Sequence, residues 1–285
     1  MKDTRIVFCS DVHLCHLAWY GCSSDERMEN MIDNLNQFYD EKPYEKIIFL
    51  GDYSLDHWEW SNGGSWLNEG VNNTENFIKQ YASRLKAPYY MAPGNHEQYG
   101  YEAWEKIAGT PRDDCFVIGG YLFISCDNYA GILDPDFHSD GEYTPTKLSF
   151  IREKMQEYPD LPVILCGHYF DFEKEPEEFF EFIKEEKRIT LLLCGHDHGN
   201  GIDDLGEKAD HVCIYHTGHY SYSGCGKTPH ELMWGFCEAL FTEDGVDIRY
   251  VEPENTFVFD NKVIKHEYRE QRHTFFRRRD KESKI

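Results

Sequence analysis

The chain has 285 residues, of which 40% are hydrophobic and 15% aromatic, and its 52 acidic and 29 basic side chains give a formal net charge of −23. This apolar fraction is enough for a packed core, which excludes a chain that is disordered throughout. No run approaches the roughly 18 consecutive apolar residues of a membrane-spanning helix, and so acidic a surface repels the phosphate backbone of nucleic acids.

The N-terminus and the cysteines predict a cytoplasmic protein. The first residues are charged and run directly into a strand-like segment, without the apolar region of a secretion signal. Ten cysteines are present, and no two have Cys-x-x-Cys spacing; Cys9, Cys126, Cys166, Cys194 and Cys213 lie inside or at the end of apolar runs. We expect buried, reduced thiols rather than disulfides or a zinc-thiolate site.

Short β-branched or aromatic runs that end in Gly, Asp, Asn or His recur along the chain. In chain order they occupy 5–13, 46–52, 88–97, 121–128, 162–168, 189–198 and 211–219. Apolar runs of this length, followed by turn residues, predict buried strands. Several are separated by amphipathic segments of helix length, at Arg27–Tyr39, Thr74–Leu85, Thr146–Tyr158 and Pro176–Glu186. Strands that alternate with helices predict an α/β fold with helices over the outer faces of the sheets.

Two segments depart from this alternation. The stretch from Tyr53 to Asn76 is rich in Trp, Gly and Asn, and predicts a long loop of the kind that is functional or disordered. From Lys262 to the end there are nine Lys or Arg against four Asp or Glu, which predicts docking on the acidic body or a solvated tail. We expect one domain over residues 1–250 and a C-terminal extension with a basic tail over residues 251–285.

Side chains that can bind metals follow five of the predicted strands. Each alone is weak evidence, because a capping Asp or a hydrogen-bonded core His is the commoner explanation. In open α/β sheets, however, ligand sites form beyond the carboxyl ends of the strands. The ordered recurrence at those ends therefore indicates one site, made of Asp11 and His13, Asp52, Asn95 and His96, His168, and His196 and His198.

The spacing and chemistry of this set favour a transition-metal site. In an extended chain, residues two apart point the same way, so Asp11 should converge with His13, and His196 with His198, whereas Asn95 and His96 should point differently. The set offers carboxylate and amide oxygens and imidazole nitrogens, without thiolates. This donor set suits Mn, Fe or Zn and is too rich in nitrogen for Ca or Mg alone.

The ordered blocks Asp-Val-His at 11–13, Gly-Asp at 51–52, Gly-Asn-His-Glu at 94–97, Gly-His at 167–168 and Gly-His-Asp-His at 195–198 resemble the calcineurin-like metallophosphoesterase superfamily. The resemblance implies a two-sheet β-sandwich flanked by helices in four layers, with two divalent transition-metal ions at the sheet edge. It implies one metal on Asp11, His13 and His198, and a second on Asn95, His168 and His196. Asp52 would bridge both, and His96 would face the substrate as a non-ligand.

The resemblance also implies an activity. A two-metal phosphoesterase would hydrolyse a small phosphomonoester, phosphodiester or nucleotide by in-line attack of a metal-bridging hydroxide, with His96 protonating the leaving oxygen or stabilising its charge. The metals would supply the positive charge that the acidic surface lacks. The expected partner is thus a small phosphorylated substrate, with neither nucleic acid nor membrane, and the oligomeric state is open.

Other functions fit the sequence less well. The protein serine/threonine phosphatases have an Asp three residues after the bridging Asp and an Arg before Gly-Asn-His-Glu, whereas this chain has Asp56 four residues on and Pro93. A nuclease acting on nucleic-acid ends is disfavoured by the net charge. A protein-binding scaffold of the same fold predicts eroded ligands, and none is missing here.

For four further residues the sequence leaves two interpretations open. Trp58 and Trp60 follow the bridging Asp52 and could overhang the metals and stack a nucleobase or sugar, or they could form a separate buried cluster. His216 and His219 fall in a late strand and the turn after it. They either contact the substrate, as the superfamily's returning segment does, or are ordinary structural histidines.

Overall fold

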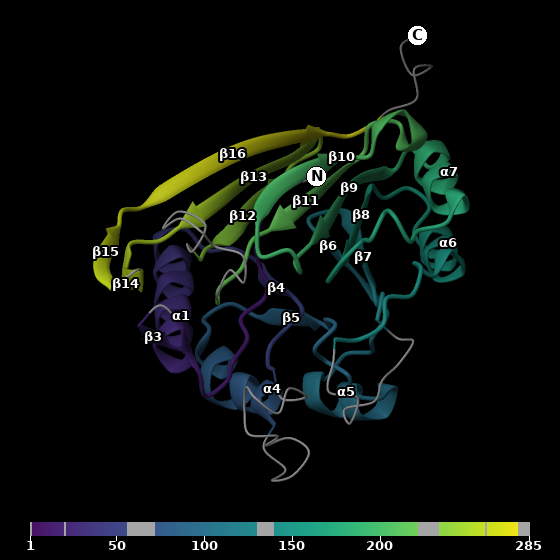
Figure 1. Cartoon of the computed structure of the whole chain (residues 1–285). Coiled ribbons are helices and arrows are strands. Elements are labelled where there is room, and N and C mark those ends of the chain that lie inside the picture. Colours follow the sequence, from purple (N-terminus) through teal and green to yellow (C-terminus); the bar gives the residue numbers. More distant parts are fainter. Residues whose placement is uncertain are drawn as a thin grey trace.

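The computed structural model describes residues 2–19, 21–55, 72–129, 140–221, 234–259 and 261–278. Within these ranges two mixed six-stranded sheets pack together and helices flank them (Figure 1). The first sheet has the order β16 (Arg269–Phe276), β13 (Gly245–Glu252), β12 (Phe236–Phe241), β1 (Thr4–Cys9), β4 (Lys46–Leu50) and β5 (Tyr89–Ala92). The second has the order β10 (Asn200–Asp204), β11 (Cys213–Thr217), β9 (Ile189–Cys194), β8 (Val163–Gly167), β7 (Tyr121–Cys126) and β6 (Asp114–Ile118). The predicted helix-flanked α/β sandwich is confirmed.

Alternate residues of the central strands face different layers. In β1, Val7 and Cys9 belong to the core cluster shared with α1 (Ser24–Glu41), whereas Ile6 and Phe8 belong to the cluster between the two sheets. In β8 and β9, one set of alternating residues also belongs to the cluster between the two sheets. The other set packs against α6 (Leu148–Glu157) and α7 (Glu177–Glu185). Both faces of these strands are apolar, which is why their sequences read as continuous hydrophobic runs.

Each predicted strand run contains a strand, whereas β6, β10, β12, β13 and β16 are not predicted by the pattern. Strands β12 and β13 alternate buried with half-buried residues, as expected when one face of an antiparallel pair is open. Charged residues on the open face interrupt the apolar run that the other strands display.

The predicted helices are present at α1, α6 and α7, with shifted ends. Helix α1 begins at Ser24, three residues before the predicted start, because Ser23 and Glu26 form a capping box. Its buried residues Met28, Met31, Ile32 and Leu35 follow the helical repeat. The pattern does not predict α5 (Tyr101–Ala108), which buries Trp104 and ends at Gly109 with a φ of 75°.

The segment Thr74–Leu85 is helical but is not one α-helix. Helix α4 (Asn73–Asn76) passes into a π-helical turn at Phe77–Tyr81 and a 3₁₀ turn at Ala82–Arg84. The side chain of Asn72 caps α4 by accepting a hydrogen bond from the backbone N–H of Glu75. The predicted Tyr53–Asn76 loop is therefore too long at its C-terminal end, and residues 56–71 lie outside the described ranges.

The basic C-terminal segment is joined to both sheets. Strand β16 pairs with β13 along its whole length, after a hairpin of β14 (Asn255–Phe259) and β15 (Lys262–His266). Figure 1 shows β16 running along the edge of the first sheet toward α7. There Arg278 donates hydrogen bonds to the carbonyl oxygens of Ile183, Glu186 and Ile189. The predicted domain boundary at residue 250 falls inside β13.

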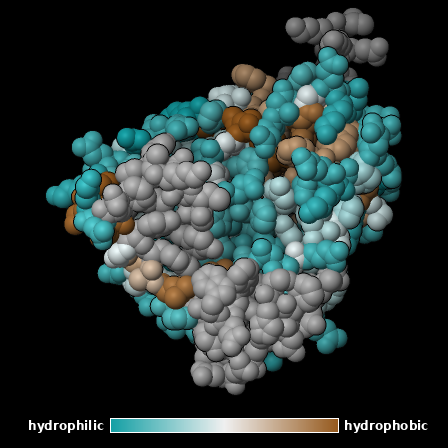
Figure 2. Space-filling view, in the orientation of Figure 1, coloured by the Kyte–Doolittle hydropathy of each residue, from teal (hydrophilic) through white to brown (hydrophobic). Residues whose placement is uncertain are grey.

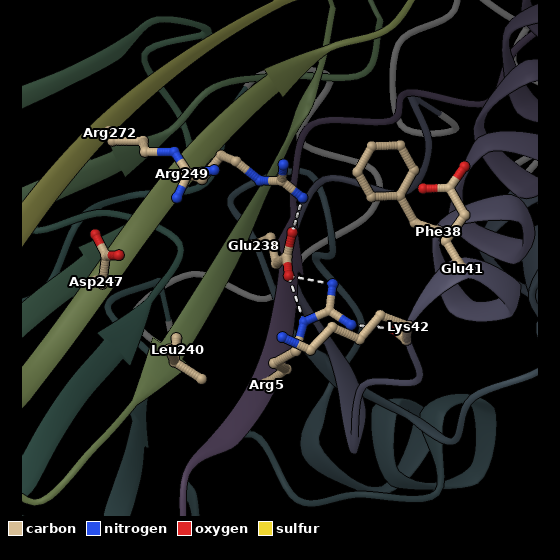
Figure 3. Close-up of a pocket in the computed structure, with 9 residues that line it drawn as sticks. All are labelled: Arg5, Phe38, Glu41, Lys42, Glu238, Leu240, Asp247, Arg249 and Arg272. Atoms are coloured by element: carbon tan, nitrogen blue, oxygen red, sulfur yellow. Dashed lines mark hydrogen bonds and ion pairs between the residues drawn. The ribbon is translucent and has the colours of Figure 1, made fainter.

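The open face of the first sheet carries a ladder of ion pairs beside α1 (Figure 3). Glu238 on β12 pairs with Arg5 on β1 and with Arg249 on β13. Arg249 also pairs with Glu270 on β16, which in turn pairs with Arg272. These arginines line a hollow of about 300 Å³. Since each already has a carboxylate partner, the ladder joins four strands and offers an anion little unbalanced charge.

Of the five cysteines in the apolar runs, four are buried as predicted and Cys213 is not; outside these runs, Cys22 and Cys115 are also half-buried. The nine cysteines in the described ranges are free thiols, and Cys9, Cys126, Cys166 and Cys194 are buried. Cys213 is half-buried rather than buried, because it opens β11 opposite Asp204 on the edge strand β10. Cys225 lies outside the described residues.

The described residues on one face of the molecule are predominantly polar (Figure 2). On the face in Figure 2, hydrophilic residues dominate and hydrophobic residues occur as small separate groups. Among the described helices, none combines the length and apolarity that a membrane crossing requires.

Candidate metal centre

The carboxyl ends of strands from both sheets meet at one place. Strands β1, β4 and β5 are mutually parallel, as are β8 and β9 in the other sheet. The predicted ligands follow the last residues of these five strands by one to four positions. The first sheet contributes Asp11, His13, Asp52 and Asn95, and the second contributes His168, His196 and His198.

The backbone at most of these positions is left-handed. Asp11, His13, Asp52, His196 and His198 have φ values of 52°, 46°, 61°, 71° and 53°. The expectation that an extended strand directs the paired residues is therefore wrong: the strands end first, and tight turns bring the side chains together. Asn95 and His96 likewise lie in a turn. A left-handed backbone conformation at a residue other than glycine costs about 1–3 kcal/mol, and it persists only where surrounding contacts fix it.

Backbone hydrogen bonds between the first two loops provide such contacts. The N–H of Asp11 donates to Gly51 O at 3.1 Å, and the N–H groups of Val12 and His13 both donate to Asp52 O at 3.0 Å. The loops after β1 and β4 therefore hold each other in register. The carboxylates of Asp11 and Asp52 thereby converge, each 3.8 Å from His13 Nε2.

All seven predicted metal ligands are brought together. Asp11 Oδ1 lies 3.3 Å from His198 Nε2, and His13 Nε2 lies 3.1 Å from the same nitrogen. Asn95 Oδ1 lies 2.9 Å from His168 Nε2 and 3.0 Å from His196 Nδ1. Asp52 Oδ2 lies between the two groups, 3.1 Å from His168 Nε2 and 3.8 Å from His13 Nε2. Its central place matches a bridging ligand, while the division of ligands between two metals stays a prediction.

Among the residues that the structure describes, three sets of potential donor atoms each fall within 4.8 Å of one another, a spacing that a single ion can span. Two of them, Asp11 with His13 and His198 and Asp52 with His168 and His196, agree with the predicted ligands. The third joins His13 and Asp52 to His96, which the sequence analysis treats as a non-ligand.

The chemistry of the donors fits divalent transition metals. His168 Nδ1 lies 2.7 Å from Leu50 O, and because a carbonyl oxygen only accepts, this nitrogen carries a proton and Nε2 is the atom that can ligate a metal. Burial lowers the pKa of His168, but Asp52 outweighs burial and raises that pKa to about 10, so without a metal Nε2 is also protonated and pairs with Asp52. Asp11 Oδ1 is buried and accepts no hydrogen bond in the described part of the chain. A bound cation would satisfy this oxygen, and these buried His and Asp clusters are consistent with a dimetal site.

The charges around the site keep the carboxylates of Asp11 and Asp52 ionised. Burial alone would raise the pKa of Asp52, but the charges of His168 and His96 outweigh it and hold that pKa below its usual range. The pKa of Asp11 is lowered in the same way, mainly by His198 and His13 against burial. Burial, followed by the charge of His168, lowers the pKa of His196 to about 4, so this ring is neutral and able to ligate.

Comparison with known proteins agrees with this geometry. The family model for calcineurin-like phosphoesterases matches residues 4–200, which include every predicted metal ligand. The chain belongs to the calcineurin-like phosphoesterase family.

Relatives within and around this family are distant. An uncharacterized metallophosphoesterase from Helicobacter pylori is 21% identical over 231 residues, which cover 78% of this chain and 52% of that protein. The chain thus spans about half the length of this curated relative. A dimetal phosphatase from Danio rerio matches with a TM-score of 0.60 at 12% identity, covering 94% of this chain and 98% of that one. GAP50, the anchor in the inner membrane complex of Plasmodium, matches with a TM-score of 0.53 at 13% identity, covering 98% and 90%. At these identities the likeness shows the fold.

Glu97, the last residue of the family's Gly-Asn-His-Glu block, holds together two of the loops that carry the predicted ligands. Its carboxylate accepts hydrogen bonds from the backbone N–H groups of Asp52, Tyr53 and Gly94, at 2.7, 2.9 and 2.8 Å. It is fully buried. One side chain therefore ties the loop after β4 to the loop after β5, a role that the sequence analysis does not assign to Glu97.

Two glycines of the family blocks stand where no side chain fits. A Cβ on Gly94 would lie 2.1 Å from Asp52 Oδ1, and one on Gly195 would lie 2.6 Å from Asp11 Oδ2. The close approach of these backbones lets the two central carboxylates lie between the loops. The glycines are needed for space, since neither has a left-handed φ.

The other predicted site residues differ in position. His96 is half-buried, with Nε2 at 3.5 Å from Asp52 Oδ2 and 3.6 Å from Asp140 Oδ1. Trp58 and Trp60 lie outside the described residues. His219 is only 1% exposed, and its ring stacks on His198 at 5.5 Å between centroids.

His216 is also buried, 7% exposed, and pairs with Asp197 and Asp203. Contact of His216 or His219 with a substrate stays a prediction.

The sequence analysis does not identify two aromatic residues that lie beside the centre. The ring of Tyr169 lies 4.3 Å from that of His196, and the ring of Tyr129 lies 6.0 Å from it. Tyr169 directly follows His168, and Tyr129 comes three residues after the end of β7. Their places after strand ends are the signal that could have found them.

The role of Glu97 predicts a stability loss. In Glu97→Gln an amide NH₂ replaces one oxygen and faces backbone N–H donors, leaving buried groups unpaired, so the free energy of unfolding should fall by about 1–3 kcal/mol. Urea denaturation of the metal-free protein measures it, with Glu102→Gln on the exposed face of α5 as the matched control. If both variants were as stable as the wild type, Glu97 would not tie the loops together.

Proposed function

We propose that the chain is a two-metal phosphoesterase that hydrolyses a small phosphorylated substrate. The observation that carries the proposal is the convergence of Asp11, Asp52 and Asn95 from one sheet with three histidines of the other, with the nearest side-chain atoms 2.9 to 3.3 Å apart. The dimetal phosphatase from Danio rerio, which shares the fold, supports it.

The donor atoms at the site indicate which side chains would hold the metals. Asp11, His13 and His198 offer one set of donors, Asn95, His168 and His196 offer another, and Asp52 lies between them. Two divalent ions there would polarise phosphoryl oxygens and lower the pKa of water toward neutrality. The chain itself supplies fixed, ionised carboxylates and a histidine, His168, whose proton is held on the far side of the ring by Leu50 O.

His96 is the candidate proton donor. Its backbone N–H donates to Asp52 Oδ1 at 3.1 Å, which fixes the residue beside the central carboxylate. Its half-buried ring lies between the buried Asp52 and the exposed Asp140. An imidazole in this place can protonate the oxygen that leaves phosphorus or stabilise its charge.

Charge favours a phosphodiester over a phosphomonoester. Each diester phosphate carries one negative charge, whereas a monoester carries about −1.5 to −2 near neutral pH. The central carboxylates pair with histidines, and the half-exposed carboxylates of Asp140 and Asp197 add negative charge nearby. The Arg that protein phosphatases place before Gly-Asn-His-Glu is Pro93 here. With two divalent ions bound the centre itself would be positive, so the preference rests on Asp140 and Asp197, which repel a dianion more than a monoanion.

The proposed proton transfer predicts a dependence on the leaving group. His96→Ala should lower turnover modestly on nitrophenyl esters, which leave without a proton, and by about 10²–10⁴-fold on alkyl esters. Steady-state rates across a leaving-group series test this, with metal content measured in the same samples. Equal losses on both ester classes would retire the general-acid role, and loss of metal would make His96 a ligand.

The charge argument predicts a substrate preference that responds to salt. With bis-nitrophenyl phosphate and nitrophenyl phosphate, kcat/KM should favour the diester by at least about tenfold at low salt, and the ratio should shrink as ionic strength screens the carboxylates. The two esters share a leaving group, and the change of the ratio with salt measures the part of the preference that is due to substrate charge. A monoester preference at every salt concentration would contradict the proposal.

A further inference from the structure

A loop of five residues between β9 and β10 holds two of the predicted metal ligands. Both His196 and His198 have left-handed backbone conformations, and Asp197 stands between them. The N–H of Asp197 donates to Gly195 O at 2.9 Å, and the N–H of His196 donates to Asp11 Oδ2 at 3.0 Å. A rotation of the loop at Asp197 would move both imidazoles at once.

The side chain of His216 holds Asp197 from the neighbouring strand. His216 Nδ1 lies 3.3 Å from Asp197 Oδ2, and Nε2 lies 2.9 Å from Asp203 Oδ2 on β10. The buried thiol of Cys194 also lies near the ring, 3.5 Å from Nδ1. One imidazole thus connects the carboxylate in the ligand loop with a carboxylate on the edge strand.

The backbone of His216 is fixed on both sides. Strand β11 pairs parallel with β9, where His216 lies opposite Cys194, and antiparallel with β10, where it lies opposite Gly201. Asn200, at the end of the loop, donates to His216 O at 2.8 Å. The imidazole is therefore a rigid point to which the loop is attached.

Resting on the two-metal function proposed above, we propose that His216 is a positioning residue that holds Asp197 and thereby directs His196 and His198 to the metals. Residues that orient metal ligands in this way commonly change metal affinity by about 10–100-fold when they are replaced. The contact to Asp197 carries the role, and the contact to Asp203 braces the ring. In this role His216 acts through Asp197 and not as a metal ligand.

The two contacts can be separated by amides of different length. Asn places its amide near the position of Nδ1 and keeps the bond to Asp197, whereas Gln reaches the position of Nε2 and keeps only the bond to Asp203. His216→Phe retains a ring and removes both contacts. The control is His211→Phe, because His211, two residues before β11, forms an exposed pair at 2.9 Å with Asp204 at the end of β10, away from the ligand loop.

The experiment is a Mn²⁺ titration of the four metal-free variants and the wild type by calorimetry, with electron paramagnetic resonance of the Mn²⁺ pair. His216→Gln and His216→Phe should bind Mn²⁺ about 10–100-fold more weakly and lose the spin-coupled signal. His216→Asn and His211→Phe should stay within about threefold of the wild type. Thermal unfolding of the metal-free proteins measures any general structural loss.

The outcomes separate the two proposals. Wild-type protein that binds no pair of ions would reject the two-metal function itself. A wild type that binds the pair, with unchanged affinity in His216→Phe and His216→Gln, would overturn the role of His216 alone. An equal loss in His216→Asn and His216→Gln, or a loss that follows the unfolding temperature across all variants, would also overturn it.

Discussion

The whole site depends on two carboxylates, those of Asp11 and Asp52, which are buried where the sheets meet. Asp11 and Asp52 are at most 1% exposed, and ionised groups at such depth are tolerated only with partners of opposite charge or metals. The partners come from the opposite sheet, as His198 beside Asp11 and His168 beside Asp52. The packing of the two sheets is thus what makes the charged centre possible, and the centre in turn fixes which strand ends can lie together.

Keeping those carboxylates in place has a conformational cost that the surroundings offset. Five ligand positions adopt left-handed backbone conformations without being glycine. The buried Glu97 gathers three N–H groups from the loops after β4 and β5, and Gly94 and Gly195 leave room for the carboxylate oxygens. Strain concentrated at a site and fixed by such contacts is typical of functional centres.

The strands that carry the site could be predicted because they are buried on both faces, so their sequences contain continuous apolar runs such as 47–50 and 191–194. The ligands could be predicted because they follow those runs. The left-handed turns could not, since the φ of Asp11 depends on its bond to Gly51, a contact between distant segments. The same holds for His216, whose partners Asp197 and Asp203 are set by the pairing of β10 with β11.

The central claim is that strand ends from both sheets build one two-metal centre around Asp52. Anomalous X-ray diffraction from crystals of the Mn²⁺-loaded protein tests it most directly, because it locates the ions without reference to activity. The account predicts two anomalous peaks about 3.5–4 Å apart, with Asp52 bound to both. A single peak, or two peaks that do not share Asp52, would contradict it.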